Sequence, residues 1–259
     1  MNLLLLDARE VAADGTVCLD DRRADHVVRV LKAAPGDRLR VGLIDGAAGS
    51  GVVTGISPGQ VRLRCEFSAA PAPPPVDLLL ALPRPKVLRR LWAQLAAIGV
   101  GRIILTNAAR VERNYFDTHL LDETSYRPLL IEGLQQARDT RVPAVTVRRQ
   151  LKILIEDELD GLCPDGLRVV AHPGGHPPVT TVVRDATPGR VLLAVGPEGG
   201  WTSYELGLLD AHGFRLASAG ERPLRTDTAC VALLSLVHDA LTGRDRPRDQ
   251  PWDEEHSSP

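Results

Sequence analysis

The sequence from Val191 to Leu206, VLLAVGPEGGWTSYEL, runs five apolar residues directly into a turn of glycine, proline and one glutamate. Five consecutive apolar residues predict a buried strand, and ligands bind at the carboxyl ends of strands in open α/β sheets. Three glycines and a proline in five residues form a rigid turn whose backbone amides can face a ligand. A strand-to-helix connection without a ligand needs fewer glycines, so we expect this turn to bind one.

A helix is predicted directly after the turn, because Thr202 and Glu205 have the spacing of a capping box. The common phosphate-binding and catalytic turns are absent from this stretch, which has no GxxxxGK[ST], GxGxxG or GxSxG pattern. The turn also has no phosphate-binding lysine. The predicted ligand is therefore held by backbone amides and by the carboxylate of Glu198.

A second segment, ASAGERPLRTDTACVAL from Ala217 to Leu233, has the same design. Small residues end a predicted strand, and a long helix follows in which Thr226 or Thr228 can act as the cap. Two loops of small residues at neighbouring strand ends frame one pocket. Neither loop alone identifies a particular kind of binding site, whereas the two loops together do.

The proline-rich stretch SAAPAPPP, Ser68 to Pro75, separates two kinds of sequence. Before it, short strand-like runs alternate with turns, and one short helix is expected near RADHVVRVLK; this predicts a small β-barrel. The expected division is a barrel over residues 1–70, a linker over 71–75, an α/β domain over 76–243 and a disordered tail over 244–259.

Strands and helices alternate after the linker, which predicts a parallel α/β sheet. The helix that starts near Pro85 has an apolar stripe of Val87, Leu91, Leu95 and Ile98 and ends at the C-cap Gly99. A second helix is expected over about Tyr126–Arg138. Further strands are expected in LRVVAHP, RVLLAVGP and FRLASAG, and the last helix ends at Gly243.

The bulk composition fits a soluble protein of a reducing compartment, and we expect it to be cytoplasmic. Apolar residues make up 44% of the 259, and the four cysteines lie far apart without a CxxC pair. The apolar run in the first segment, MNLLLLDARE, is too short for a signal peptide, and the segment lacks the basic residues that would precede such a run. No membrane span is expected. His172 and His176 form an HxxxH pattern, but the intervening glycines and prolines prevent the helix that would align them, so no metal is expected.

Positive charge is concentrated in two segments although the net charge is −2. Arg84 to Arg113 has seven Lys and Arg residues against one acid, and Arg138 to Lys152 has five against one. Such a face can bind a polyanion. Solvated arginines on helices explain the charge equally well.

GPEGGWTSYEL and the later GERPLRTDTA together resemble the RsmE family, the 16S ribosomal RNA (uracil-N3)-methyltransferases of the SPOUT superfamily. The segments HVVRVLK, GDRLRVGLIDG, IGVGRIILTNAAR and ARDTRVP are similar to other family stretches, so the resemblance spans Leu3 to about Gly243. This chain departs from the usual pattern at Asp227, where the family has Glu, in SAGERP, in PRPKVLRRLWAQ and at Gln135–Gln136. The departures bear more on the target nucleotide than on the cofactor.

The resemblance implies an α/β fold in which a C-terminal SPOUT trefoil-knot methyltransferase domain with a parallel sheet follows a small N-terminal PUA-like β-barrel. It also implies a homodimer that holds S-adenosylmethionine and acts on 16S rRNA of the small ribosomal subunit. Carried over to this sequence, the cofactor-binding residues are Ala171, His172, Gly196, Pro197, Glu198, Gly199, Gly200, Ala219, Gly220, Pro223, Leu224 and Thr226.

Methyl transfer to uracil N3 needs alignment of the two reactants and a cation beside the developing uracil anion. Arg225 is the first candidate for that cation, and Arg110 and Arg141 are weaker ones. Each of the three can instead be a surface ion-pair partner, and for Arg110 that alternative is favoured. We expect Glu198 to bind the cofactor, although it can also serve as base. RNA phosphates are expected to contact Arg29, Lys32, Arg84, Lys86, Arg89 and Arg90.

Two other functions remain open at this stage. One is a SPOUT methyltransferase that acts on another RNA or another position, such as transfer RNA or a 2′-hydroxyl. The other is a non-catalytic RNA-binding protein with a degenerate knot domain. The intact GPEGG turn speaks against the second, because a pocket without a ligand has no need of its glycines or of Glu198.

Overall fold

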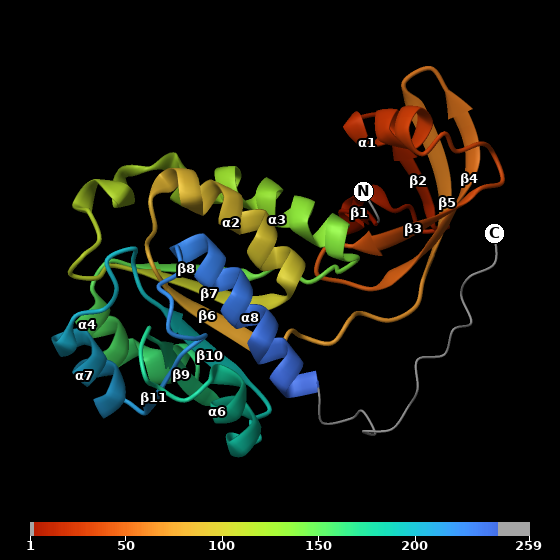
Figure 1. Cartoon of the computed structure of the whole chain (residues 1–259). Coiled ribbons are helices and arrows are strands. Elements are labelled where there is room, and N and C mark those ends of the chain that lie inside the picture. The colour runs from red at the N-terminus through yellow and green to blue at the C-terminus, as the bar shows by residue number, and fades with distance from the viewer. Residues whose placement is uncertain (1–2, 243–259) are drawn as a thin grey trace.

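The computed structural model describes residues 3–242 as two sheets with helices packed around the larger one (Figure 1). The tail predicted over 244–259 and the helix end predicted at Gly243 lie outside the described residues. Among the residues described, no helix is long and apolar enough to cross a membrane.

The first sheet curls and has the strand order β1-β3-β4-β5-β2. Its strands are β1 (Leu4–Leu6), β2 (Thr16–Leu19), β3 (Arg38–Leu43), β4 (Ala48–Ser57) and β5 (Gln60–Phe67). The expected short helix is present as α1 (Arg22–Asp25), which continues into one π-helical turn, η2 (His26–Val30). Alternate residues of β5 are buried, and they form with Val27 a separate small core, as expected for a sheet with one covered face.

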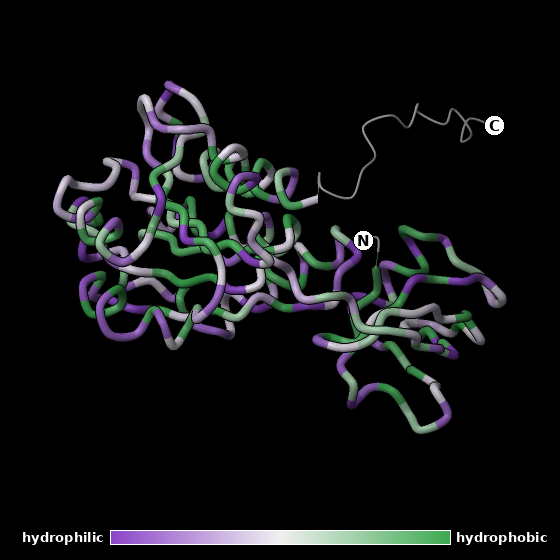
Figure 2. Tube along the Cα trace, turned by 90° about the horizontal axis from the view of Figure 1, so that it is seen from below, coloured by the Kyte–Doolittle hydropathy of each residue, from purple (hydrophilic) through white to green (hydrophobic). Residues whose placement is uncertain are grey.

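The second sheet has six strands in the order β11-β9-β10-β6-β7-β8, all paired in parallel. The strands are β6 (Val76–Ala81), β7 (Val100–Thr106), β8 (Ala144–Arg148), β9 (Leu167–Ala171), β10 (Val191–Val195) and β11 (Phe214–Ala217). Every residue of β6 and β10 is buried, because helices cover both faces of a parallel sheet. The predicted parallel α/β architecture is confirmed, and Figure 2 shows apolar segments at the centre of this larger body.

The longer helices are α2 (Pro85–Ile98), α3 (Glu123–Ala137), α6 (Val179–Ala186), α7 (Ser203–Ala211) and α8 (Thr226–Thr242). Helix α2 packs against α3 and α8, and α8 also packs against α6 (Figure 1). Of the predicted stripe on α2, Val87, Leu91 and Leu95 are buried and Ile98 is partly buried. Gly99 ends the helix with φ 91°, which glycine adopts without strain.

The remaining elements are short. They are η1 (Ala8–Glu10), η3 (Arg113–Asp117), η4 (His119–Leu121), α4 (Leu151–Ile153), η5 (Leu154–Glu158) and α5 (Leu159–Leu162). The second predicted helix starts three residues earlier than expected, at Glu123, and ends at Ala137. Neither β8 nor α6 was expected. The segment of α6, VTTVVRDA, is rich in β-branched residues, which favour strands, and tertiary packing overrides that preference.

Hydrogen bonds between the two sheets' segments fix the first sheet against the second. Thr140 Oγ1 donates to the carbonyl of Gly46 at 2.7 Å, and the backbone nitrogen of Val142 donates to Asp45 Oδ1 at 2.8 Å. The backbone nitrogen of Leu3 donates to the carbonyl of Gln135 at 3.1 Å. The side chains of Leu3 and Leu5 belong to the core of the larger sheet, so β1 contributes to both parts of the molecule.

Candidate active site

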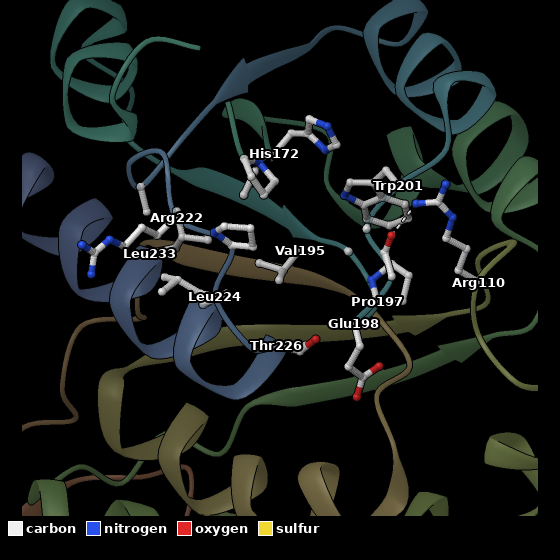
Figure 3. A pocket seen from close by; sticks show the side chains of 18 of the residues that line it. Arg110, His172, Val195, Pro197, Glu198, Trp201, Arg222, Leu224, Thr226 and Leu233 are labelled. Carbon is white, nitrogen blue, oxygen red and sulfur yellow. Dashed lines mark hydrogen bonds between the residues drawn. The ribbon is translucent and has the colours of Figure 1, made fainter. Parts of the chain in front are cut away.

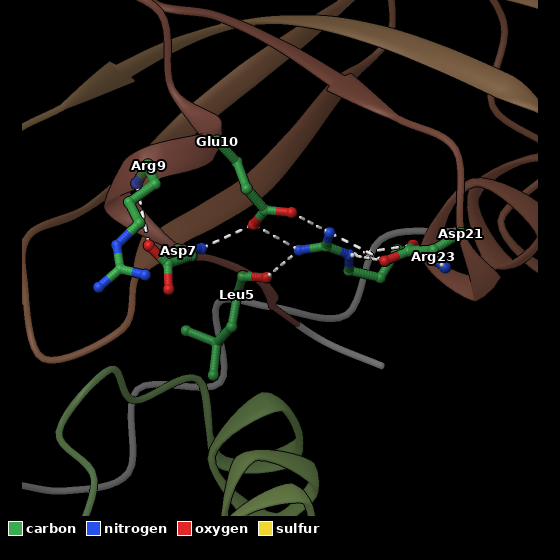
Figure 4. Close-up of polar contacts among 6 residues, drawn as sticks. All are labelled: Leu5, Asp7, Arg9, Glu10, Asp21 and Arg23. Carbon is green, nitrogen blue, oxygen red and sulfur yellow. Dashed lines mark hydrogen bonds and ion pairs between the residues drawn. The ribbon is translucent and has the colours of Figure 1, made fainter.

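A cavity of about 300 Å³ lies where β9, β10 and β11 end, between the loops that follow these three neighbouring strands. All twelve residues predicted to bind the cofactor line this cavity. The two loops of small residues therefore frame one pocket, as the sequence predicted, and the segment from Ala171 to Pro173 forms a third wall (Figure 3).

The glycine turn closes over a short backbone hydrogen bond. The nitrogen of Gly200 donates to the carbonyl of Pro197 at 2.8 Å, and Gly200 has φ 74°, a conformation that favours glycine. Helix α7 begins immediately afterwards with the predicted capping box, in which Thr202 caps the helix and Glu205 reaches back to the nitrogen of Thr202 at 2.7 Å. The turn is thus held from both sides by local bonds.

Arg110 lies across the turn. Its guanidinium donates to the carbonyl of Gly199, and a Cβ built on Gly199 would stand 2.9 Å from Arg110 Cδ (Figure 3). Contacts of 2.9 Å are shorter than real Cβ atoms make, so any other residue at position 199 would force the Arg110 side chain to shift. The loop after β7 therefore covers one side of the pocket and brings a cation to it.

Glu205 connects the same two loops from within the protein. Its side chain is buried, one carboxylate oxygen accepts from the backbone nitrogen of Ala109 at 2.7 Å, and the other accepts from Thr202. A carboxylate with three donors is fully hydrogen-bonded, which offsets the cost of burying its charge. The positions of Arg110 and of the glycine turn therefore depend on one side chain.

Two nitrogen atoms of the pocket wall are buried without a hydrogen-bond partner, Trp201 Nε1 and His172 Nδ1. Burial lowers the pKa of His172 below its ordinary value, and the neighbouring His176 and Arg110 lower it further. His172 is therefore uncharged at neutral pH. A buried polar atom without a partner costs free energy, so these two atoms are available to a ligand that supplies the partner.

Glu198 points away from the cavity interior, toward the start of α2 (Figure 3). The backbone nitrogen of Arg84, the residue that precedes α2, donates to Glu198 Oε1 at 3.4 Å. The amino terminus of a helix favours a negative charge. This contact joins the glycine turn to the exposed basic residues that begin on α2.

The predicted catalytic arginines occupy three different places. Arg110 lines the cavity. Arg225 does not; its side chain is 77% exposed and its Nε lies 3.8 Å from Asp227 Oδ1. Arg141 does not line the cavity either, because its Nε donates to the carbonyl of Pro71 at 3.1 Å, in the segment between the two sheets.

Besides Arg110 and the twelve residues carried over from the resemblance, six residues line the cavity: Pro173, Val195, Trp201, Arg222, Ala229 and Leu233. Arg222 and Trp201 lie within the two quoted motifs, so their position beside the glycines was a usable signal. Ala229 and Leu233 follow Thr226 at helical spacing on α8, which places all three on one face of that helix.

The six residues predicted to contact RNA phosphates, Arg29, Lys32, Arg84, Lys86, Arg89 and Arg90, are all exposed. Arg90 forms an ion pair of 2.6 Å with Asp227 in the first turn of α8. Arg29 lies 3.5 Å from Asp25. Four of the six therefore share the start of α2, near Glu198, and the other two lie in or beside η2 of the first sheet.

In the part of the chain that the structure describes, no three His, Cys, Asp or Glu side chains gather as a metal site would require. The rings of His172 and His176 lie 5.8 Å apart between centroids. The four cysteines are free thiols.

Comparison with known proteins agrees with both parts of the molecule. A model described as an RNA methyltransferase domain matches residues 70–238, and one described as an RNA methyltransferase PUA domain matches residues 19–65. The ribosomal RNA small subunit methyltransferase E of Treponema pallidum is 31% identical over 92% of this chain and 90% of its own length. That of Mycobacterium bovis is 26% identical over 87% of each chain.

Solved structures share the fold. The ribosomal RNA small subunit methyltransferase E of Neisseria gonorrhoeae, crystallised with S-adenosylmethionine, superposes with a TM-score of 0.71 at 18% identity over 91% of this chain and 95% of that one. A Legionella pneumophila methyltransferase, in complex with the same cofactor, gives 0.71 at 22% identity over 93% and 98%. The resemblance read from the two glycine loops is thus confirmed, and the chain belongs to the ribosomal RNA small subunit methyltransferase E family, the RsmE branch of the SPOUT methyltransferases.

Proposed function

We propose that this protein transfers a methyl group from S-adenosylmethionine to N3 of a uridine in 16S rRNA of the small ribosomal subunit. Membership in the family carries the assignment to S-adenosylmethionine-dependent methylation of ribosomal RNA. The single structural observation that supports it most is the three-walled pocket, which collects every residue expected to hold the cofactor.

The residues that line the pocket fit this cofactor by their chemistry. Apolar side chains of Val195, Leu224 and Leu233 line it, and backbone groups of two glycine loops face it. Two buried nitrogens on its wall lack partners, and Gly199 leaves room where a side chain would collide. When bound, S-adenosylmethionine supplies an electrophilic methyl group on a positively charged sulfur.

Held by the glycine turn and the loop after β11, the cofactor would supply its methyl group to uracil N3 and leave as S-adenosylhomocysteine, and the N3 proton would pass to solvent. The protein's main task is alignment, which is worth about 7–11 kcal/mol in favourable cases. Arg110 and Arg222 line the pocket, which supports the proposal that they stabilise the negative charge that develops on the uracil ring. Arg225 remains the third proposed cation, at the outer end of the same loop.

The proposal includes further properties that the family resemblance implies. These are a trefoil knot through the three pocket loops, a homodimer, a cytoplasmic site of action with the ribosomal substrate, and the division into domains at 70 and 75. The exposed basic residues at the start of α2 and in η2 are proposed to contact RNA phosphates.

The test uses purified protein, S-adenosylmethionine with a labelled methyl group, and, in separate reactions, ribosomal subunits and transfer RNA from cells that lack this protein. The proposal predicts label in the RNA of the small subunit and none in the large one. Label in transfer RNA or at a 2′-hydroxyl would support the other methyltransferase function. No label together with no binding of S-adenosylhomocysteine would indicate a non-catalytic RNA-binding protein.

A further inference from the structure

Trp201 follows the glycine turn directly, and its side chain is only 3% exposed. A Cβ built on Gly196 would stand 3.0 Å from Trp201 Nε1 and 3.1 Å from Cδ1, so the indole lies flat against the backbone of Gly196. The same indole lines the pocket. Trp201 is thus packed between the glycine turn and the ligand cavity.

The indole N–H is a donor with no acceptor. Nε1 has no partner in the structure, and an indole nitrogen can only donate. Figure 3 shows the nitrogen-bearing edge of the ring turned away from Arg110 and toward the side on which His172 lies. His172 Nδ1 is also buried without a partner, so two unmatched polar atoms belong to side chains that line one pocket.

An unpartnered indole is not by itself evidence of a ligand, because Trp92 Nε1 is also buried without a partner. Trp92 lies on α2 in the core, fully buried, with its ring centroid 5.0 Å from that of Tyr126. It does not line the cavity. What distinguishes Trp201 is its place on the pocket wall together with a second unmatched atom there.

We propose that the indole N–H of Trp201 donates a hydrogen bond to a neutral acceptor in the adenosine part of the bound cofactor, either a ring nitrogen or a ribose oxygen. This inference rests on the proposed function. A carboxylate is disfavoured at this edge because the pocket cation, Arg110, lies on the other side of the indole and His172 is uncharged. Protein atoms cover Nε1 in the free protein, so this hydrogen bond requires the covering atoms to move when the cofactor binds.

The direct test follows the indole N–H signals of the ¹⁵N-labelled full-length protein by NMR, while calorimetry measures binding of S-adenosylhomocysteine. The Trp201 signal, assigned by its loss in Trp201→Phe, is expected to move downfield on binding, and the Trp92 signal is expected to stay in place. Addition of 5′-methylthioadenosine, which lacks the carboxylate, should give the same shift, and methionine should give none.

Substitution provides the second readout. Trp201→Phe keeps an aromatic ring and removes the donor, so it should weaken binding of S-adenosylhomocysteine about 5- to 10-fold. The matched control Trp92→Phe removes an equally unpartnered donor outside the pocket and should leave the affinity unchanged.

The outcomes separate this inference from the function on which it rests. If the wild-type protein does not bind S-adenosylhomocysteine, the proposed function fails first. If it binds while the Trp201 signal stays in place, or if Trp201→Phe binds with wild-type affinity, the indole donates to no part of the cofactor. If the signal moves only with ligands that carry the carboxylate, the assignment to adenosine is wrong.

Discussion

Glu205 accepts a hydrogen bond from the backbone nitrogen of Ala109 at 2.7 Å, although the two residues lie 96 positions apart. The same carboxylate caps helix α7 through Thr202. One buried side chain therefore fixes the loop that carries Arg110 and the start of the helix that follows the glycine turn.

Replacement of Glu205 by alanine leaves the backbone nitrogens of Ala109 and Thr202 without acceptors. We expect a loss of about 2–3 kcal/mol in the free energy of unfolding, measured in urea. Asp210→Ala, an exposed position on the same helix, is the control and should change little. Equal effects of the two substitutions would show that the link between the loops adds no stability.

Asp77, near the start of β6, forms an ion pair with Arg190, which directly precedes β10. This pair lies at the end of the strands opposite the pocket. Arg190 donates to both carboxylate oxygens at 2.7 and 2.6 Å, and the Asp77 side chain is 3% exposed. Arg190→Ala leaves the buried Asp77 carboxylate without its cation, so we expect a loss of about 3 kcal/mol in the free energy of unfolding, measured in urea. The double variant Asp77→Ala, Arg190→Ala should lose less than the sum of the single changes. Strict additivity would contradict the coupling.

Gly199→Ala places a Cβ 2.9 Å from Arg110 Cδ and 3.2 Å from its Cβ. Arg110 must move, so binding of S-adenosylhomocysteine, measured by calorimetry, should weaken about tenfold. Gly207→Ala is the matched control, because nothing lies within 4 Å of its added Cβ on exposed α7. It should leave binding unchanged and stabilise the helix by about 0.5–1 kcal/mol. Wild-type affinity in Gly199→Ala would show that binding does not require Arg110 to lie against the glycine turn.

Acid should destabilise the protein in part through His172, whose pKa is lowered mainly by burial. The unfolded chain binds a proton near the ordinary value of 6.5, whereas the folded protein binds it only at lower pH. Stability from this residue is therefore complete above pH 6.5 and is lost as the pH falls toward the lowered pKa. Thermal unfolding between pH 7.5 and 5 should show a smaller decrease for His172→Gln than for wild type; parallel curves would exclude this contribution.

The three candidate cations can be separated by kinetics. Arg222 and Arg110 line the cavity, whereas Arg225 and its neighbour Asp227 lie outside it. If the arginines that line the cavity stabilise the developing uracil anion, Arg222→Ala should lower the rate of methyl transfer at saturating substrates by about 10²-fold or more. Arg225→Ala would then act mainly on RNA binding and raise KM. A large loss of kcat in Arg225→Ala alone would reverse the two roles.

The pocket was more predictable from sequence than the rest of the fold. Gly196, Gly199 and Gly200 can be recognised in the sequence, because few other residues allow neighbouring atoms to approach the backbone so closely. The buried strand β10 was equally clear as an uninterrupted apolar run. Contacts between distant segments cannot be recognised in this way. The hydrogen bonds from Ala109 to Glu205 and from Arg141 to Pro71 arise from tertiary packing. Strand β8 was missed because its side chains are at best partly buried.

The central claim is methylation of uridine N3 with the cofactor held in the three-walled pocket. The most direct measurement is mass spectrometry of nucleosides from small subunits of cells lacking this protein, before and after incubation with the protein and S-adenosylmethionine. We expect 3-methyluridine to appear at one site. At limiting cofactor, the Gly199→Ala protein should form it more slowly than the Gly207→Ala protein. Methyl label in any nucleoside other than 3-methyluridine would contradict the assignment to N3, and formation of 3-methyluridine at equal rates by both variants would contradict the assignment of the pocket.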